Sequence, residues 1–555
     1  MSLEKNISEL IKNINHVGYP TALKQFLENN SAFEDKFKKM EGSIAFRANN
    51  CNNSRCLVIN SDFGNVPENL SHAFEQVWSF EEDSDKSFIQ KYRFEYENRK
   101  NITIIKSKKE LFSFPENYFE LIVLNGIRQQ DILELGIKNY VNEIKKLLTE
   151  CGCICVGAHN KYGINLFRKE NESIGEKKEI VDSVKGYKKI FESLGLKVKP
   201  YWVFPSYTKP HYSADIEDDV SLEWFFKNFD KTFSVDKKFS VIRNSLKILN
   251  SKSRKMLVER FAPSFLFYCY QNIIPENIES MVMKKTGLKN CIQNIRHSKI
   301  MYILLDSLGI PQKAVFCKLK KFELKENIVE IQRKFPNMRE PDEKIVMEDW
   351  VSGDVLDPSN KDNFNLTMKW IVKFQEETKS ELLTLEEIEK ESAKVKNDLR
   401  EIDAMNTLPF EKWVDDYTDY MNSLNIKKTA VHGDFQTRNI LVDSTNSSVN
   451  VIDWDWRFQE KGNPIYDFVW LGTNLMIEGN NMIDSFLSHL NQRGKNTDSL
   501  KILEKTMNMH FKQDFDFIKL QRFMILRFIT IKIKDGTLGY LSYIELLKIL
   551  SKEKF

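Results

Sequence analysis

Short β-rich runs that alternate with helical stretches constrain the fold of the first part of the chain. Between residues 51 and 216, segments with helical spacing of apolar residues separate the runs RCLVIN, QVWSF, NITIIK, FELIVLNG, CICVGAH and LKVKPYWVF. Strands that alternate with helices are typical of a parallel sheet covered by helices on both faces. We therefore expect a doubly wound α/β domain at residues 51–216, after a helical lead-in at residues 1–50.

The rest of the chain has a different pattern. Residues 217–254 follow a polar stretch and are expected to form a helix and then a segment rich in Lys and Ser, which together indicate a linker. Beyond it, MVMKK (281–285) and KIVMEDWVSG (344–353) resemble strands of a small sheet, and long helical patterns follow. We expect an α+β domain at residues 255–555, with an N-lobe at about 255–350 and a C-lobe at about 351–555.

Charge and cysteine usage exclude several classes of protein. The chain has 82 Lys+Arg and 79 Asp+Glu, a net charge of +3, which is too even for a dedicated nucleic-acid binder. No apolar stretch reaches the roughly 18 residues that cross a bilayer, so we expect no membrane span and a cytoplasmic protein. The eight cysteines form no C-x-x-C pair. Cys151, Cys153 and Cys155 alternate along a predicted strand, where buried thiols are the expectation and a metal site is the alternative.

A polar loop between two apolar runs carries the clearest chemical signal. Asp434 is followed, after four intervening residues, by Asn439, and Asp453 follows fourteen residues after Asn439. A carboxylate near an acceptor hydroxyl and two hard oxygen ligands for Mg²⁺ are what phosphoryl transfer requires. The alternative is a turn in which Asp434 and Asn439 only satisfy backbone groups.

The segments HGDFQTRNILVD, VIDWDW and GNPIYDFVWL resemble the aminoglycoside phosphotransferase/choline kinase group of kinase-like enzymes, over residues 255–555. The resemblance implies ATP and Mg²⁺ as cofactors and a hydroxyl of a small molecule or glycan as the acceptor. It implies that Asp434 is the catalytic base, that Asn439 and Asp453 bind the metal, and that His432 and Asp467 are structural. Gly433, together with Trp454-Asp455 after the metal-binding Asp453, departs from the protein-kinase pattern and disfavours a protein kinase.

Upstream residues are assigned by the same resemblance. Lys284 is placed like the strand lysine that contacts the nucleotide phosphates, with Lys285 as its rival. Residues 346–353 resemble the hinge between the lobes, so Met347 and Asp349 are expected beside the adenine. The segment NIRHSKIMYILL is expected to form the helix after Lys284, and it lacks the usual glutamate partner of that lysine.

Residues 51–216 resemble class I S-adenosylmethionine-dependent methyltransferases of the surface-glycan type. The resemblance rests on CLVINSDFGNVPENL, VWSFEEDS, FPENYFELIVLNGI and LLTECGCICVGAHNKYG. It implies that S-adenosylmethionine binds beside Gly64, with Glu81 on the ribose. The loop after the first strand keeps only Gly64, and Lys106-Ser107 stand where a second acidic residue is expected, so active methylation and a degenerate scaffold remain alternatives.

The leading hypothesis is an ATP- and Mg²⁺-dependent phosphotransferase fused to a methyltransferase-like domain. A second hypothesis is a bifunctional kinase–methyltransferase that modifies a surface polysaccharide. A third is a non-catalytic binding or scaffold protein with degenerate nucleotide sites. Antibiotic phosphorylation is a further alternative, which would require an acidic acceptor pocket for a polycationic drug.

Overall fold

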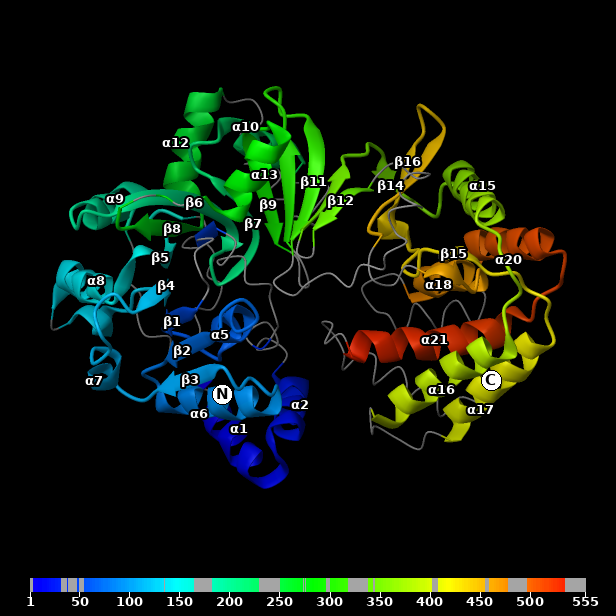
Figure 1. Ribbon diagram of the computed structural model, residues 1–555, viewed down its shortest axis with the longest axis horizontal. Helices are drawn as coiled ribbons and strands as arrows, with labels where there is room; N and C mark the ends of the chain where they lie inside the picture. Colours follow the sequence, from blue (N-terminus) through cyan, green and yellow to red (C-terminus); the bar gives the residue numbers. More distant parts are fainter. Residues whose placement is uncertain are drawn as a thin grey trace. The chain divides into compact units, whose positions relative to one another are not determined.

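The computed structural model divides the chain into two compact units, one of Met1–Phe322 with Glu340–Asp349 and one of Glu323–Arg339 with Trp350–Phe555 (Figure 1). The residues that it describes are 3–30, 37, 47–48, 54–133, 135–163, 182–228, 250–272, 274, 276–295, 300–317, 338–342, 345–401, 408–454, 459–477 and 497–534. No helix within these ranges is long and apolar enough to cross a bilayer.

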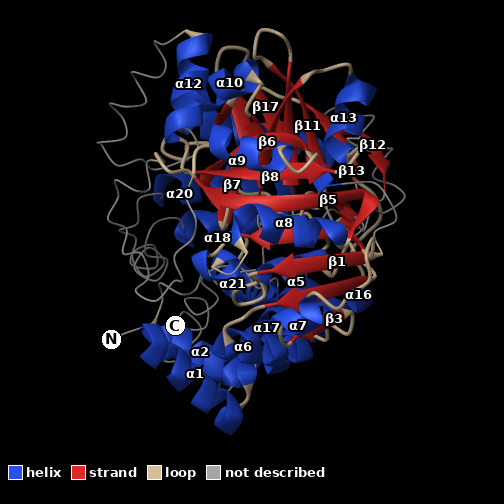
Figure 2. Cartoon of the chain, turned by 90° about the vertical axis from the view of Figure 1, so that its left-hand side faces the viewer, coloured by secondary structure: helices blue, strands red, loops and turns tan. Residues whose placement is uncertain are grey.

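One continuous sheet organises the first unit. Over the described residues it has 13 strands in the order β12-β13-β11-β10-β9-β7-β6-β8-β5-β4-β1-β2-β3. Figure 2 shows the strands of this sheet in red. The strands are β1 (Arg55–Ile59), β2 (Gln76–Phe80), β3 (Ile102–Ile105), β4 (Phe119–Asn125), β5 (Leu148–His159), β6 (Lys197–Ser206), β7 (Lys209–Asp215), β8 (Ser264–Tyr270), β9 (Asn290–Ile295), β10 (Ile300–Leu305), β11 (Pro311–Cys317), β12 (Met338–Asp342) and β13 (Ile345–Asp349).

Strands β1 to β5 form the parallel part of this sheet. They pair in the order β3-β2-β1-β4-β5, and the interior strands β1 and β4 are runs of buried apolar residues because both of their faces are covered. Helices occupy the connections, as expected, so the predicted doubly wound α/β fold is confirmed. The helices of this unit are α1 (Leu3–Val17), α2 (Tyr19–Asn29), α5 (Asn65–Leu70), α6 (Ser84–Tyr96), α7 (Lys108–Leu111), η2 (Gln129–Ile132), α8 (Gly136–Lys146), α9 (Val184–Glu192), α10 (Asp219–Asn228), α12 (Ser251–Phe261) and α13 (Ile278–Thr286).

The helical lead-in is present as α1 and α2, which contact each other and α6. Ile7, Leu10 and Ile14 are buried along one face of α1, as their three- and four-residue spacing predicts. Most of residues 31–50 lie outside the described residues.

Strand β8 changes the domain boundary that the sequence suggested. It inserts between β5 and β6 and runs antiparallel to both. Part of the predicted C-terminal domain 255–555 therefore belongs to the first sheet, and the predicted linker 217–254 contains α10 and the start of α12. Pairing between residues more than 100 positions apart, such as Cys153 and Tyr270, leaves no local pattern in the sequence.

The predicted N-lobe is continuous with this same sheet. Strands β9, β10, β11 and β13 form an antiparallel meander, and β9 pairs with β7. The fully buried Arg47 reinforces the junction: its guanidinium lies 2.5 Å from Glu279 of α13 and donates to Ser213 of β7 at 2.6 Å. The methyltransferase-like strands and the meander are therefore parts of one sheet, and Arg47 joins the lead-in to it.

The second unit is mainly helical around two small sheets. Tyr417 of α17 and Phe523 of α21 stack in its core with ring centroids 3.7 Å apart. One sheet has the order β14-β16-β17 and the other pairs β15 with β18. The antiparallel strands β16 and β17 form a hairpin that directly follows the polar loop. The elements are β14 (Asp354–Val355), α15 (Lys361–Glu377), α16 (Leu385–Glu401), α17 (Leu408–Asn422), β15 (Thr429–Val431), η5 (Thr437–Asn439), β16 (Ile440–Asp443), β17 (Ser448–Val451), β18 (Gln459–Gly462), α18 (Ile465–Ile477), α20 (Thr497–Phe511) and α21 (Phe517–Lys534).

Candidate active site

Helix α18 holds the polar loop that joins β15 to η5. Asp467, in the first turn of α18, accepts the backbone N–H groups of His432 and Gly433 at 2.8 and 2.9 Å. Gly433 has φ +79°, a left-handed conformation that glycine adopts without strain. Burial raises the pKa of Asp467, while His432 and the two N–H donors act in the opposite direction. Asp467 therefore holds the start of the loop through two backbone N–H groups.

His432 links this loop to the strand that precedes Asp453. Its Nδ1 accepts the backbone N–H of Asp434 at 3.2 Å, so the hydrogen-bond network assigns the ring proton to Nε2. Nε2 then donates to the carbonyl oxygen of Ile452 at 3.0 Å. The His432 ring is also 4.5 Å from that of Trp454, centroid to centroid. The buried imidazole thus holds two separate parts of the site together.

Three side-chain N–H groups hold the carboxylate of Asp434. Oδ1 accepts from Trp470 Nε1 at 3.1 Å, and Oδ2 accepts from Gln436 Nε2 at 3.0 Å and from Asn439 Nδ2 at 3.2 Å. The residue is only 8% exposed. Neighbouring Phe435 is fully buried and stacks on Trp370 of α15, which anchors the loop in the core. The carboxylate is therefore held in one orientation.

Asn439 is oriented by the same contacts. Its Nδ2 also donates to the carbonyl oxygen of Asp434 at 2.9 Å. Because both acceptors are oxygens, they fix the amide so that Oδ1 is directed away from Asp434. The Asn439 carbonyl accepts the backbone N–H of Ile452 at 2.9 Å, which connects the loop directly to the residue before Asp453.

Asp453 follows β17 and is half-buried. Its φ of +67° is unusual for a residue other than glycine, although aspartate tolerates it better than most. The hydrogen bonds of Ile452 with Asn439 and His432 connect the residue before Asp453 to the loop of Asp434. The oxygen donors of Asn439 and Asp453 fit Mg²⁺, which usually takes one or two protein carboxylates and completes its shell with substrate oxygens. Within the described ranges, no three His, Cys, Asp or Glu residues could hold a metal by themselves.

The predicted nucleotide lysine lies on a helix. Lys284 is in α13, its side chain is 80% exposed, and its Nζ is 3.4 Å from Glu276. The helix forms because Asn277 and Ser280 make a capping box at its start and Gly287 ends it in a left-handed conformation. The expected helix NIRHSKIMYILL is instead formed, in its described residues, by β9 and β10. Lys284 therefore does not end a strand, contrary to the prediction.

Met347 and Asp349 lie on β13, where they pair with β11, and Asp349 forms an ion pair with Lys313. A sequence signal that was missed is the apolar run Ala314-Val315-Phe316-Cys317 at the end of β11, which Lys318 follows in the sequence. It has the form of the V-A-I-K motif, whose lysine meets the nucleotide phosphates. Lys318 itself lies outside the described residues.

The residues predicted to bind S-adenosylmethionine are already engaged with other residues of the chain. Glu81, at the end of β2, is buried and accepts hydrogen bonds from Nη1 and Nη2 of Arg128, at 2.6 and 2.9 Å. It also accepts the backbone N–H groups of Asp62 and Asp83. Arg128 was missed because it follows β4, 47 residues from Glu81 in the sequence. A carboxylate paired in this way does not fit a ribose diol, so the residues present do not fit the cofactor.

Gly64 has φ +88°, and a Cβ added there would lie 2.7 Å from Cζ of Phe94. This glycine therefore allows α6 to pack closely against the loop. The close packing of Phe94 is thus a sufficient reason for a glycine at position 64, and no bound ligand is needed to explain it.

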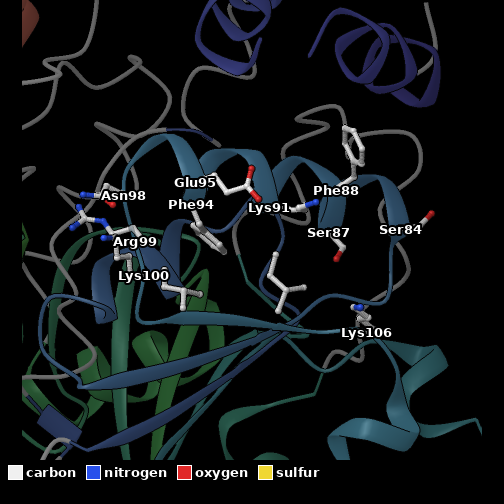
Figure 3. A pocket seen from close by; sticks show the side chains of 12 residues that line it. Ser84, Ser87, Phe88, Lys91, Phe94, Glu95, Asn98, Arg99, Lys100 and Lys106 are labelled. Atoms are coloured by element: carbon white, nitrogen blue, oxygen red, sulfur yellow. The ribbon is translucent and has the colours of Figure 1, made fainter. Parts of the chain in front are cut away.

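A cavity of about 590 Å³ lies between α6 and β3 (Figure 3). Lys106, Ser84 and Ser87 lie at one end of it, and Asn98, Arg99 and Lys100 lie at the other. Its lining includes neither Glu81 nor Gly64. The cavity is therefore separate from the predicted cofactor residues.

The three alternating cysteines lie on β5. Cys153 and Cys155 are buried and Cys151 is exposed. Burial raises the pKa of the Cys155 thiol to about 12. Cys153 and Cys155 are therefore core thiols, as expected.

Comparison with protein families gives one match. Residues 367–500 match the phosphotransferase enzyme family. This segment contains Asp434, Asn439 and Asp453, so the resemblance and the enzyme class predicted from the loop are confirmed for this part of the chain. No curated protein matches the chain in sequence.

Solved structures show distant similarities. A putative methyltransferase from Bacillus halodurans is 12% identical, over 40% of this chain and 94% of that one, with a TM-score of 0.25. A SAM-dependent methyltransferase from Aquifex aeolicus is 15% identical, over 32% and 89%, with a TM-score of 0.22. A macrolide 2'-phosphotransferase type I is 13% identical, over 48% and 95%, with a TM-score of 0.35. At these scores the similarities say nothing about ligands or activity.

Proposed function

We propose that the second unit transfers the γ-phosphoryl group of ATP, with Mg²⁺, to a hydroxyl of a small molecule or glycan. The arrangement of Asp434, Asn439 and Asp453, joined through the hydrogen bonds of one loop, carries this proposal. The family match over the same segment supports it.

In phosphoryl transfer, the protein mainly positions the reacting groups and stabilises the negative charge of the transition state. Asp434, held on both carboxylate oxygens, would accept the proton of the acceptor hydroxyl as the new P–O bond forms. The bond from the γ-phosphorus to the bridging oxygen breaks in the same transfer, and that oxygen leaves with ADP. Asn439 Oδ1 and the Asp453 carboxylate would hold Mg²⁺ against the phosphate oxygens. When bound, the ion offsets the charge on those oxygens.

For the first unit, we infer a non-catalytic role in place of methylation. A bifunctional enzyme would need a cofactor site at Glu81, and the bidentate pair of Glu81 with Arg128 argues against one. Its sheet does provide the strands that continue into β9–β13. The first unit would therefore act as a scaffold for the residues of the predicted N-lobe.

The Asp453→Asn variant tests the metal assignment. Asparagine tolerates a positive φ at least as well as aspartate, so the variant removes a charge and leaves the backbone undisturbed. We expect calorimetric titration of the full chain to show that ATP binding no longer depends on Mg²⁺, with turnover at least about 10²-fold lower.

Asp419→Asn is the matched control, because Asp419 is an exposed aspartate on α17 of the same unit. It should retain both Mg²⁺ dependence and turnover. Wild-type turnover in Asp453→Asn would show that Asp453 is not a metal ligand.

A further inference from the structure

We propose that Trp470 is a positioning residue for the phosphoryl-transfer step, because its indole N–H fixes the orientation of the Asp434 carboxylate. This inference rests on the proposed function. Trp470 lies in the middle of α18, is 1% exposed, and places Nε1 3.1 Å from Oδ1 of Asp434.

Tryptophan at position 470 buries an N–H group, and the contact with Asp434 gives that group an acceptor. A buried indole N–H usually has an acceptor, because an unpaired N–H group in the core costs free energy that an apolar side chain does not. Trp470 packs against Phe528, with ring centroids 5.0 Å apart, a role that a phenylalanine could also fill. What tryptophan adds is the N–H group, and that group meets the predicted catalytic carboxylate.

Helix α18 controls both the backbone and the side chain of the loop. Asp467 and Trp470 are three residues apart and therefore share one face of the helix. Asp467 accepts the backbone N–H groups that lead into Asp434, and Trp470 donates to the Asp434 side chain. One face of α18 thus fixes both the backbone at the start of the loop and the orientation of the Asp434 carboxylate.

Helix α18 is itself held in place by extensive burial in the core. Every residue from 465 to 476 is buried except Asn474, and α18 contacts α20 and α21. Gln436 and Asn439, which donate to the other carboxylate oxygen, belong to the loop and its 3₁₀ turn and would move with it. Trp470 instead ties the carboxylate to the core. Because transfer rates depend steeply on the geometry of the reacting groups, loss of this tie should slow the chemical step.

The test compares Trp470→Phe with Trp413→Phe in the full chain. Trp413 lies on α17, is half-buried and contacts Phe410 and Arg522, so its replacement makes the same chemical change away from the loop. Turnover is measured with Mg·ATP as the probe and water as the acceptor. The calorimetric stoichiometry of Mg·ATP binding gives the fraction of each variant that is folded.

For Trp470→Phe we expect a kcat about 10- to 100-fold lower, the range for a hydrogen bond to a charged group, with KM for Mg·ATP within about 2-fold of wild type. Trp413→Phe should change neither. A kcat within about 2-fold of wild type in Trp470→Phe, or a KM that changes as much as kcat, would overturn the proposal.

A thermal double-mutant cycle with Asp434→Ala gives a readout that does not depend on activity. If the contact exists, the Tm losses of Trp470→Phe and Asp434→Ala add to more than the loss of the double variant. Additive losses would show that the two side chains do not interact. A wild-type chain that binds no Mg·ATP would instead overturn the proposed function, and with it the role of Trp470 in catalysis.

Discussion

At the scale of single residues, Asp434 should affect transfer without affecting nucleotide binding. Asparagine at this position keeps the size of the side chain but presents an amide to the three N–H donors and cannot accept a proton. For Asp434→Asn we expect Mg·ATP affinity to stay near wild type and turnover to fall by about 10² to 10⁴, the range of general-base catalysis. Calorimetry and a phosphate-release assay measure the two quantities. An equal loss of ATP affinity would mean that Asp434 holds the metal.

The sequence predicted the residues of this loop because their relationship is local. Asp434, Asn439 and Asp453 lie within twenty residues of one another, and their spacing is visible in the printed sequence. Trp470 and Arg128 could not be found in this way. Their partners, Asp434 and Glu81, are 36 and 47 positions away, and neither residue has a spacing that sets it apart from an ordinary core or surface residue.

At the scale of elements, the loops at the carboxyl ends of β1, β2 and β4 determine whether the first unit binds S-adenosylmethionine. Glu81 would have to leave Arg128 before it could accept a ribose hydroxyl, and this exchange costs a charge-assisted ion pair. We expect calorimetric titration of the full chain to give an S-adenosylmethionine affinity no tighter than roughly 100 μM. A tight one-to-one isotherm would show that the cofactor binds with another geometry and would restore the bifunctional hypothesis.

Helices and strands were predicted correctly where the apolar pattern extends over many residues, and incorrectly where it covers only a few. The alternating strands and helices of 51–216 are present, as are the helices of the lead-in. MVMKK was assigned to a strand because five residues do not distinguish a strand from a helix. Asn277 and Gly287, which cap the two ends of helix α13, lie just outside that run. These caps favour a helix over a strand for MVMKK.

At the scale of the whole molecule, the sheet makes the predicted C-terminal domain dependent on the N-terminal half. A fragment of residues 255–555 loses the partners of β8 and the β7 partner of β9. It also leaves Glu279 buried without Arg47, and breaking a buried ion pair costs about 3–5 kcal/mol. Exposed strand edges favour aggregation. We expect this fragment to be poorly soluble when expressed alone.

The fragment 1–350 is the matched comparison, because it keeps every described strand of the large sheet. It should be soluble and unfold cooperatively in urea. Cooperative unfolding of 255–555 by itself would show that this fragment does not depend on the strands of the N-terminal half.

The most direct test of the central claim is ³¹P NMR of ATP with the full chain, with and without Mg²⁺, for the wild type and for Asp434→Ala. The central claim is that the loop of Asp434, Asn439 and Asp453 forms a phosphotransferase centre. The account predicts that the wild type consumes the γ-phosphate resonance only when Mg²⁺ is present, and that Asp434→Ala binds Mg·ATP but slows this loss by at least about 10²-fold. Loss of the resonance without Mg²⁺, or at the same rate in Asp434→Ala, would contradict it.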